Sequence, residues 1–208
     1  MIIYTDLDYV LNHYTPDMLD VCYSLFGNRD ISASECDRLS KDGPFSYAKK
    51  EIPLTEDMVD QAVYVVDRDR ARWLPTPWGQ VLANALIDRM DNHGDEVRVI
   101  TSRSTWRHAG RVVHDIFGKE APLFTCESKY KHLIMEDNSI YFEDSPLIIN
   151  NSLKTHKNMI VFYPLWAWNK DKVEKEVEDR SIKMTMGMWP RVPAIIESAI
   201  RRIESDKG

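Results

Sequence analysis

The sequence is poor in glycine and lacks the glycine-rich loop that many nucleotide-binding enzymes use to hold phosphates. Only eight of its 208 residues are glycine, and no Gly-Lys-Ser or Gly-Lys-Thr step occurs anywhere in the chain. The P-loop requires that step at the start of a helix. Kinases built on a P-loop are therefore excluded.

Cysteine and histidine offer no recognisable metal-binding pattern. The three cysteines, Cys22, Cys36 and Cys126, are far apart and odd in number, which fits neither a zinc site nor a disulfide framework. None of the six histidines lies four residues from another, so the helical zinc motif of many hydrolases is missing. Free thiols in a reducing compartment are the simplest interpretation.

Long apolar runs and an excess of basic residues are also missing. No segment approaches the roughly 20 apolar residues of a membrane helix, and the first residues do not resemble a signal peptide. We therefore expect a cytoplasmic protein with no membrane partner. The formal net charge of -6 argues against nucleic acid as the dominant partner, although a local basic patch is compatible with it.

What the sequence does contain is the composition of a folded protein, with 43% hydrophobic and 29% charged residues. Runs that are apolar on both faces, at 2–5, 97–100, 139–142 and 159–162, predict parallel strands covered by helices. Helix-length segments at 77–92, 105–117 and 130–136 separate them, and an amphipathic stretch follows Trp189. This order predicts a Rossmann-like α/β fold with three layers.

The first strand and the next strong one are roughly ninety residues apart, far more than a simple crossover needs. Within this interval, segments 15–26, 32–39 and 55–66 have the length and start signals of helices. We therefore predict an α/β core formed by residues 1–14 and 75–208, with a small helical cap inserted at 15–74.

Two acids, Asp6 and Asp8, follow the first predicted strand and are separated by one residue. The carboxyl ends of parallel strands are where open α/β sheets bind ligands. Two acids at this spacing also arise by chance, and we interpret those at 67–69 as part of a solvated face. The position directly after an apolar strand is what makes Asp6 and Asp8 candidates for chemistry.

Two later strands also end in residues with side-chain oxygens. Thr101 and Ser102 follow the second strong strand, where hydroxyl and N–H groups at a helix start can hold a phosphate oxygen. Helix capping alone would explain them equally well. Glu143 and Asp144 follow the third, and with the acids of the first strand they form an oxygen-lined set that suits Mg²⁺.

A cation in this region would offset the repulsion among the acids and an incoming phosphate. Lys129 and Lys131 both lie between the second and third motifs. We prefer Lys129, because it follows Ser128 at an apparent helix start, and keep Lys131 as the alternative.

In this order, the four motifs resemble those of the haloacid dehalogenase superfamily of phosphohydrolases. The resemblance covers the predicted core and not the cap. Segments 143–146 and 161–169, together with the long helical insertion, are similar to the deoxyribonucleotidase-like branch. Two positions depart from the common pattern, because Tyr9 stands where glycine is frequent and Glu143 where aspartate is.

The resemblance implies a Mg²⁺-dependent hydrolysis of a small phosphate monoester through an aspartyl phosphate on Asp6. Asp8 would protonate the leaving group and then activate water. The implied metal ligands are Asp6, Asp8, Asp144 and Glu143, and the implied phosphate contacts are Thr101, Ser102, Lys129 and Lys131. We expect a nucleoside monophosphate as the substrate.

Candidates for substrate contact are aromatic or basic, and comprise Phe45, Arg72, Trp73, Arg103 and Trp168. Aromatic side chains in an inserted helical segment more often belong to its core, and Arg103 is as readily explained by a solvated helix face.

Three alternatives stay open at this point, and the oligomeric state is open as well. A basic groove would favour a nucleic-acid 3′ phosphate as substrate, and a tight polar pocket would favour a sugar phosphate. A non-catalytic phospho-receiver or binding module is the third, although a receiver has no use for the long insertion or for Asp8.

Overall fold

The computed structural model describes residues 1–12, 14–27, 54–66, 68, 76, 78–103, 106–118, 121–166, 169 and 171–206. Its centre is a six-stranded sheet with the strand order β3-β2-β1-β4-β5-β6, in which every neighbouring pair is parallel. The strands are β1 (Ile2–Asp6), β2 (Glu96–Thr101), β3 (Leu123–Thr125), β4 (Ser139–Phe142), β5 (Ile160–Pro164) and β6 (Ser181–Met184). The predicted α/β fold is confirmed.

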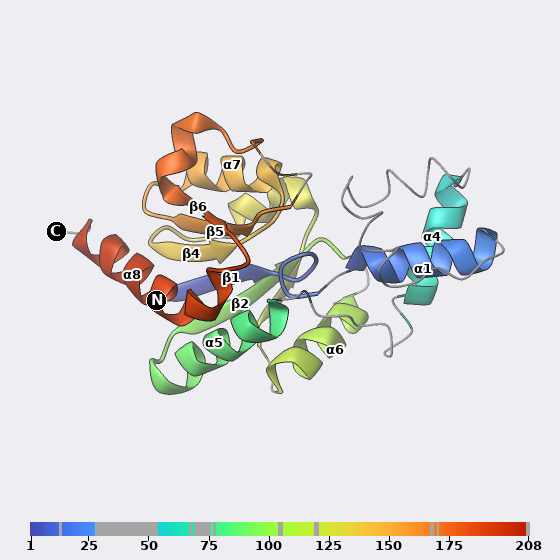
Figure 1. Ribbon diagram of the computed structural model, residues 1–208, viewed down its shortest axis with the longest axis horizontal. Coiled ribbons are helices and arrows are strands. Elements are labelled where there is room, and N and C mark those ends of the chain that lie inside the picture. Colours follow the sequence, from blue (N-terminus) through green and yellow to red (C-terminus); the bar gives the residue numbers. More distant parts are fainter. Residues whose placement is uncertain are drawn as a thin grey trace.

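Helices cover both faces of this sheet and give the molecule its three layers (Figure 1). One face is covered by α5 (Gly79–Asn92), α6 (Trp106–Phe117) and α8 (Val192–Ser205), and the other by α7 (Pro146–Thr155). Short 3₁₀ helices complete the core, namely η2 (Ser128–Leu133), η3 (Lys175–Arg180) and η4 (Trp189–Arg191). The helix expected at 130–136 is therefore a 3₁₀ helix that begins and ends earlier.

Alternation along β1 assigns its side chains to two separate cores. Ile3 packs in the cluster beneath α5, α6 and α8, whereas Tyr4 packs in the cluster beneath α7. Both side chains are fully buried, as expected for a central parallel strand. The apolar run that predicted this strand is thus explained by burial on both of its faces.

The edge strands β3 and β6 are the two that the sequence did not predict. β3 has three residues, with Phe124 41% exposed, and β6 has four, with Ile182 and Lys183 only partly buried. Side chains of an edge strand are less completely buried than those of a central strand, so the sequence of an edge strand shows no continuous apolar run.

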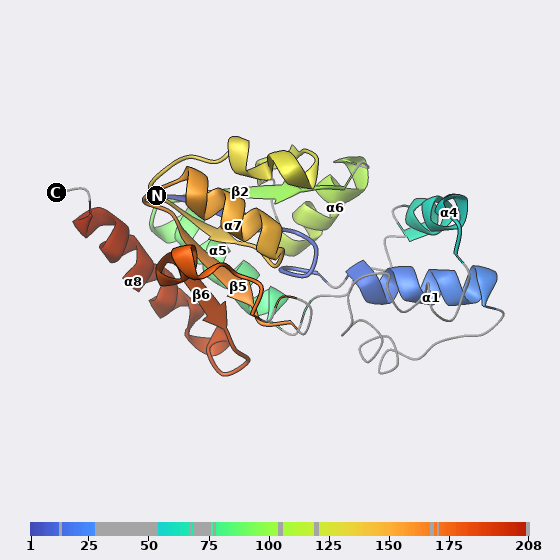
Figure 2. The same ribbon diagram turned by 90° about the horizontal axis from the view of Figure 1, so that it is seen from above.

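Two further helices, α1 (Tyr14–Phe26) and α4 (Glu56–Val66), follow β1 and lie apart from the sheet in both views (Figures 1 and 2). They pack on each other through a small core of their own, formed by Met18, Val21, Cys22, Ala62 and Val66. The third predicted cap helix, at 32–39, lies outside the described residues. The division into a core and a cap at 15–74 stays a prediction.

Hydrogen bonds join the segment that leaves the sheet after β1 to the segment that returns to it before α5. Thr76 donates from its backbone N–H to the Leu11 carbonyl (3.2 Å) and from its hydroxyl to the Val10 carbonyl (2.9 Å). Gly79 opens α5 against the same carbonyl, and a Cβ there would lie only 2.1 Å from the Leu11 oxygen. Only glycine permits this approach.

Over the described part of the chain, no helix combines the length and the apolar character needed to cross a bilayer.

Candidate active site

The carboxyl ends of β1, β2 and β4 meet at one edge of the sheet and surround a cavity of about 320 Å³. Because β1 lies between β2 and β4, Asp6 is at the centre of this edge. The described residues that line the cavity are Asp6, Asp8, Tyr9, Ser102, Ser128, Lys131, Glu143, Asp144, Ser145, Pro146 and Ile148. Its volume is within the range of sites for small ligands.

Three carboxyl groups and one ammonium group form the base of the cavity. Oxygen atoms of Asp6, Glu143 and Asp144 lie within 4.8 Å of one another. Lys131 Nζ lies 2.8 Å from Asp6 Oδ1 and donates to Glu143 Oε2 at 3.2 Å. All four residues are buried.

Glu143 is held through both of its carboxylate oxygens. Its Oε1 accepts from the backbone N–H groups of Asp144 (3.1 Å) and Ser145 (3.0 Å), and its Oε2 accepts from the Tyr141 hydroxyl and from Lys131. A fully buried carboxylate needs such partners, because desolvation without them is costly. Glu143 therefore fixes both the lysine and the start of the loop that carries Asp144.

Burial and mutual repulsion shape the ionisation of this cluster. The pKa of Asp6 is raised by burial and by the Glu143 carboxylate, against the opposing effect of Lys131. The pKa of Asp144 is also raised, by burial and then by Glu143 and Asp6. Burial alone would lower the pKa of Lys131, but Asp6 and Glu143 outweigh it and raise that pKa.

This charge balance fits a divalent cation. When ionised, three carboxylates face a single ammonium, which leaves an excess of two negative charges in a buried place. Hard oxygen ligands of this kind suit Mg²⁺. Glu143 has both of its oxygens engaged by the protein, so Asp6 and Asp144 are the better candidates to hold the ion.

The structure reverses the preference between the two candidate lysines. The Lys129 side chain is 60% exposed and pairs with Glu127 at 2.8 Å, whereas Lys131 is buried against Asp6. The apparent helix start after Ser128 does not decide between the two lysines. In the 3₁₀ helix η2, Lys129 faces solvent and Lys131 faces the cavity.

Asp8 also lines the cavity and is bound by a buried arginine. Arg103 Nε lies 3.0 Å from both Asp8 carboxylate oxygens, and Arg103 Nη2 also donates to Oδ1. With its amide oriented to satisfy both neighbours, Asn12 donates to Asp8 Oδ1 (3.1 Å) and accepts from Arg103 Nη2 (2.8 Å). Arg103 thus contacts a site carboxylate and not a solvated helix face. Asp8 is outside the cluster of three acids and is not placed as a side-chain metal ligand.

The hydroxyl groups after β2 take different positions. The Thr101 side chain is buried, and its Oγ1 accepts from the backbone N–H of Arg103 at 3.3 Å. Ser102, the next residue, lines the cavity and accepts a hydrogen bond from Ser128 Oγ at 2.8 Å. Ser102 and Ser128 therefore belong to the described residues that line the cavity, and Thr101 does not.

Several contributors were not found from the sequence. Tyr141, inside β4, supplies the hydroxyl that holds Glu143. Asn169 is fully buried and donates to the backbone carbonyls of Asp144 (3.0 Å) and Pro164 (2.8 Å), which ties the loop after β4 to the end of β5. A polar residue inside an apolar strand was the only available signal for Tyr141. The predicted substrate contacts Phe45, Arg72, Trp73 and Trp168 lie outside the described residues.

Tyr9 has the left-handed backbone conformation that favours glycine, with φ at 61°. It lines the cavity and packs edge-on against Trp166, with ring centroids 6.4 Å apart. The residue at this unusual position therefore contributes an aromatic wall that glycine would not.

No protein-family model and no curated protein matches the sequence. Solved structures do match the fold. A candidate β-phosphoglucomutase from Thermotoga maritima aligns over 92% of this chain and 97% of its own, with a TM-score of 0.54 and 12% identity. A candidate haloacid dehalogenase-like hydrolase from Burkholderia xenovorans aligns over 96% and 97%, with a TM-score of 0.53 and 11% identity. At such identity the likeness establishes the fold alone.

Proposed function

We propose that the protein is a Mg²⁺-dependent phosphatase that hydrolyses a phosphate monoester through an aspartyl phosphate on Asp6. One observation carries the proposal. A buried carboxylate, Asp6, ends the central strand beside a buried lysine and a second acid, Asp144, that is suited to hold a metal ion. The motifs that resemble the haloacid dehalogenase superfamily and the matching fold support the same reaction class.

The bound ion would supply charge neutralisation at the phosphate oxygens, which is the chemistry a divalent metal offers phosphoryl transfer. Asp6 and Asp144 would hold it. Asp6 Oδ1 accepts from the Leu7 backbone N–H (2.8 Å) and contacts Lys131, so the orientation of this carboxylate is fixed before substrate arrives. Such preorganisation lowers the cost of reaching the transition state.

In the first step an Asp6 oxygen forms a bond to phosphorus while the bond between phosphorus and the leaving oxygen breaks. Asp8 donates a proton to that oxygen. In the second step Asp8 takes a proton from water as the water attacks phosphorus, which releases inorganic phosphate and restores Asp6. Lys131 and Ser102 would bind the non-bridging oxygens of the phosphate.

The pair of Asp8 and Arg103 adds a requirement to this scheme. In the arrangement observed, both carboxylate oxygens of Asp8 accept from the Arg103 guanidinium, so they are already engaged before a leaving group arrives. An incoming phosphate offers Arg103 another anion. We infer that substrate binding draws Arg103 towards the phosphate and frees Asp8 to act as an acid.

A nucleoside monophosphate is the substrate class we propose first, on the resemblance of segments 143–146 and 161–169 to the deoxyribonucleotidase-like branch. The aromatic side chain of Tyr9 at the cavity is compatible with a base or sugar nearby. A phospho-receiver would also use acids and a lysine, but it would not turn over.

The test is phosphate release from nucleoside monophosphates, sugar phosphates and an aryl phosphate, with Mg²⁺ or with EDTA, for the wild type and Asp6→Asn. The proposal expects metal-dependent turnover that the substitution abolishes. Phosphorylation of the protein without turnover would favour a receiver, and undiminished activity of Asp6→Asn would exclude the mechanism.

A further inference from the structure

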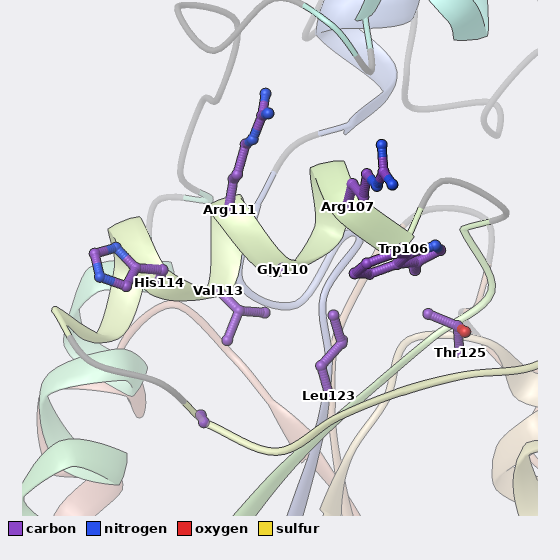
Figure 3. Close-up of a pocket in the computed structure, with 9 residues that line it drawn as sticks. Trp106, Arg107, Gly110, Arg111, Val113, His114, Leu123 and Thr125 are labelled. Atoms are coloured by element: carbon purple, nitrogen blue, oxygen red, sulfur yellow. The ribbon is translucent and has the colours of Figure 1, made fainter.

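A second and larger cavity, of about 790 Å³, lies between α6 and the edge strand β3 (Figure 3). It is outside the acidic cluster, and we call it the α6 groove. The described residues that line it are Trp106, Arg107, Gly110, Arg111, Val113, His114, Ala121, Leu123 and Thr125. No role in the proposed hydrolysis accounts for it.

The floor of the groove is apolar and its wall holds an exposed aromatic ring. Val113 is buried and Leu123 is half-buried, and a Cβ at Gly110 would lie 3.8 Å from the Leu123 side chain. Trp106 is 61% exposed. In Figure 3 its ring lies between Arg107 and Thr125, at the end of the groove where α6 begins. A large exposed ring with open space beside it is a surface on which a flat ligand can stack.

Two arginines lie on the same helix as that ring. Arg107 and Arg111 are four residues apart, which places them on one helix face, and Figure 3 shows both extending from the same side of α6. The Arg107 guanidinium carbon lies 5.4 Å from the centre of the Trp106 ring. Within the described residues, neither arginine has a carboxylate partner, and in a chain of net charge -6 this makes the groove locally basic.

The groove begins at the same edge of the sheet as the candidate active site. Thr125 pairs with Thr101 at the ends of β3 and β2, and the Cys126 N–H donates to the Thr101 carbonyl at 3.1 Å. The chain then continues into Ser128 and Lys131, which line the smaller cavity. A ligand with its phosphate beside Asp6 could therefore extend along β3 into the groove.

We propose that the α6 groove binds single-stranded nucleic acid, and that the phosphate removed by the enzyme is the terminal phosphate of such a strand. A base would stack on Trp106, and backbone phosphates would contact Arg107 and Arg111. Stacking rings next to cations are the usual means of binding single strands without reading their sequence. The binding part of this inference stands alone, whereas its catalytic part rests on the proposed function.

Binding is tested first, with the Asp6→Asn protein so that the probe stays intact. Fluorescence anisotropy would follow short fluorescent DNA and RNA strands that carry a 3′ or a 5′ phosphate. We expect Trp106→Ala to weaken binding about tenfold. Removing Arg107 and Arg111 together should also reduce the slope of log affinity against log salt by roughly 0.7 for each phosphate that the protein no longer neutralises. Arg201→Ala, which removes another exposed arginine, from α8, should change neither quantity.

The catalytic part is tested by comparing KM for an end-phosphorylated strand and for a nucleoside monophosphate in the wild-type background. The groove variants should raise KM roughly tenfold for the strand only. Equal effects on both substrates, or no effect on strand binding, would overturn the proposal. Strand binding that depends on Trp106, without phosphate release from any substrate, would keep the binding site and reject the proposed function instead.

Discussion

The ammonium nitrogen of Lys131 lies 2.8 Å from Asp6 Oδ1, and both side chains are buried at the end of the central strand. The positive charge of the lysine offsets part of the negative charge of the Asp6, Glu143 and Asp144 carboxylates. The same ammonium group would contact the phosphate of a bound substrate. An exchange of this buried lysine should therefore affect the reaction far more than an exchange of its exposed neighbour.

The first prediction compares Lys131→Met with Lys129→Met. Loss of the buried cation removes charge stabilisation at phosphate and should reduce kcat by about 10²–10³-fold, the usual cost of losing one such group. Lys129 contacts Glu127 and the Tyr130 ring at the surface, so its exchange should have less than about a twofold effect. Steady-state kinetics decide the matter, with circular dichroism to show that both variants fold. Equal losses would contradict the assignment of Lys131.

The second prediction concerns Asp144→Asn. The pKa of Asp144 is raised in the folded protein by burial and by Glu143, so the favourable contribution of its protonated form is fully present below the ordinary value of 3.8. This contribution is lost as the pH rises through the higher folded pKa. In EDTA, Asp144→Asn should therefore unfold at a higher temperature than the wild type at pH 8, with a smaller difference near pH 4.

The same variant also tests the metal site. Mg²⁺ should raise the unfolding temperature of the wild type at pH 8 and leave that of Asp144→Asn nearly unchanged, because binding to the folded state alone stabilises it. An equal response of both proteins to Mg²⁺ would show that Asp144 is no ligand.

The third prediction concerns Arg103→Gln. This exchange removes the bidentate partner of Asp8 and, in our scheme, a contact with the phosphate. Misplacement of a catalytic group by about 1 Å can cost roughly 100-fold, and we expect a loss of this size in kcat/KM. Arg98→Gln, which removes a partly exposed arginine bound to Glu96 and Glu136, is the control. Retained activity in Arg103→Gln would show that Asp8 needs no such partner.

The fourth prediction concerns the junction between the sheet and the two outlying helices. Gly79→Ala would place a Cβ 2.1 Å from the Leu11 carbonyl oxygen, so backbone must shift. We expect a loss of about 1–3 kcal/mol in the free energy of unfolding, measured in urea. Gly187→Ala has no atom within 4 Å of the new Cβ and should lie within about 0.5 kcal/mol of the wild type. Similar stabilities for the two would argue against the close approach.

Much of the core could be predicted because its strands are buried on both faces. Ile3 and Tyr4 enter opposite clusters, and the resulting apolar run is visible in the sequence. The short edge strands β3 and β6 leave no such signal. The acids of the site could be predicted because each follows an apolar strand. The direction in which each side chain points could not be predicted.

The two lysines illustrate that limit. Lys129 and Lys131 have the same charge and neighbouring positions, and only the path of a six-residue 3₁₀ helix decides which of them is buried. The contact between Asp8 and Arg103 spans 95 positions, and no local pattern indicates it. The groove likewise requires β3, which the sequence did not reveal.

The central claim is that Asp6 becomes phosphorylated during turnover. The most direct measurement is acid-quench mass spectrometry of Asp8→Asn mixed with Mg²⁺ and an aryl phosphate. The aryl leaving group needs little help from an acid, so the first step can proceed without Asp8. Hydrolysis of the intermediate still needs the base that this variant lacks. The account predicts one phosphoryl group on the peptide that carries Asp6, absent with EDTA and absent from Asp6→Asn. Turnover by the wild type without a phosphorylated protein in this trap, or a phosphoryl group on another residue, would contradict it.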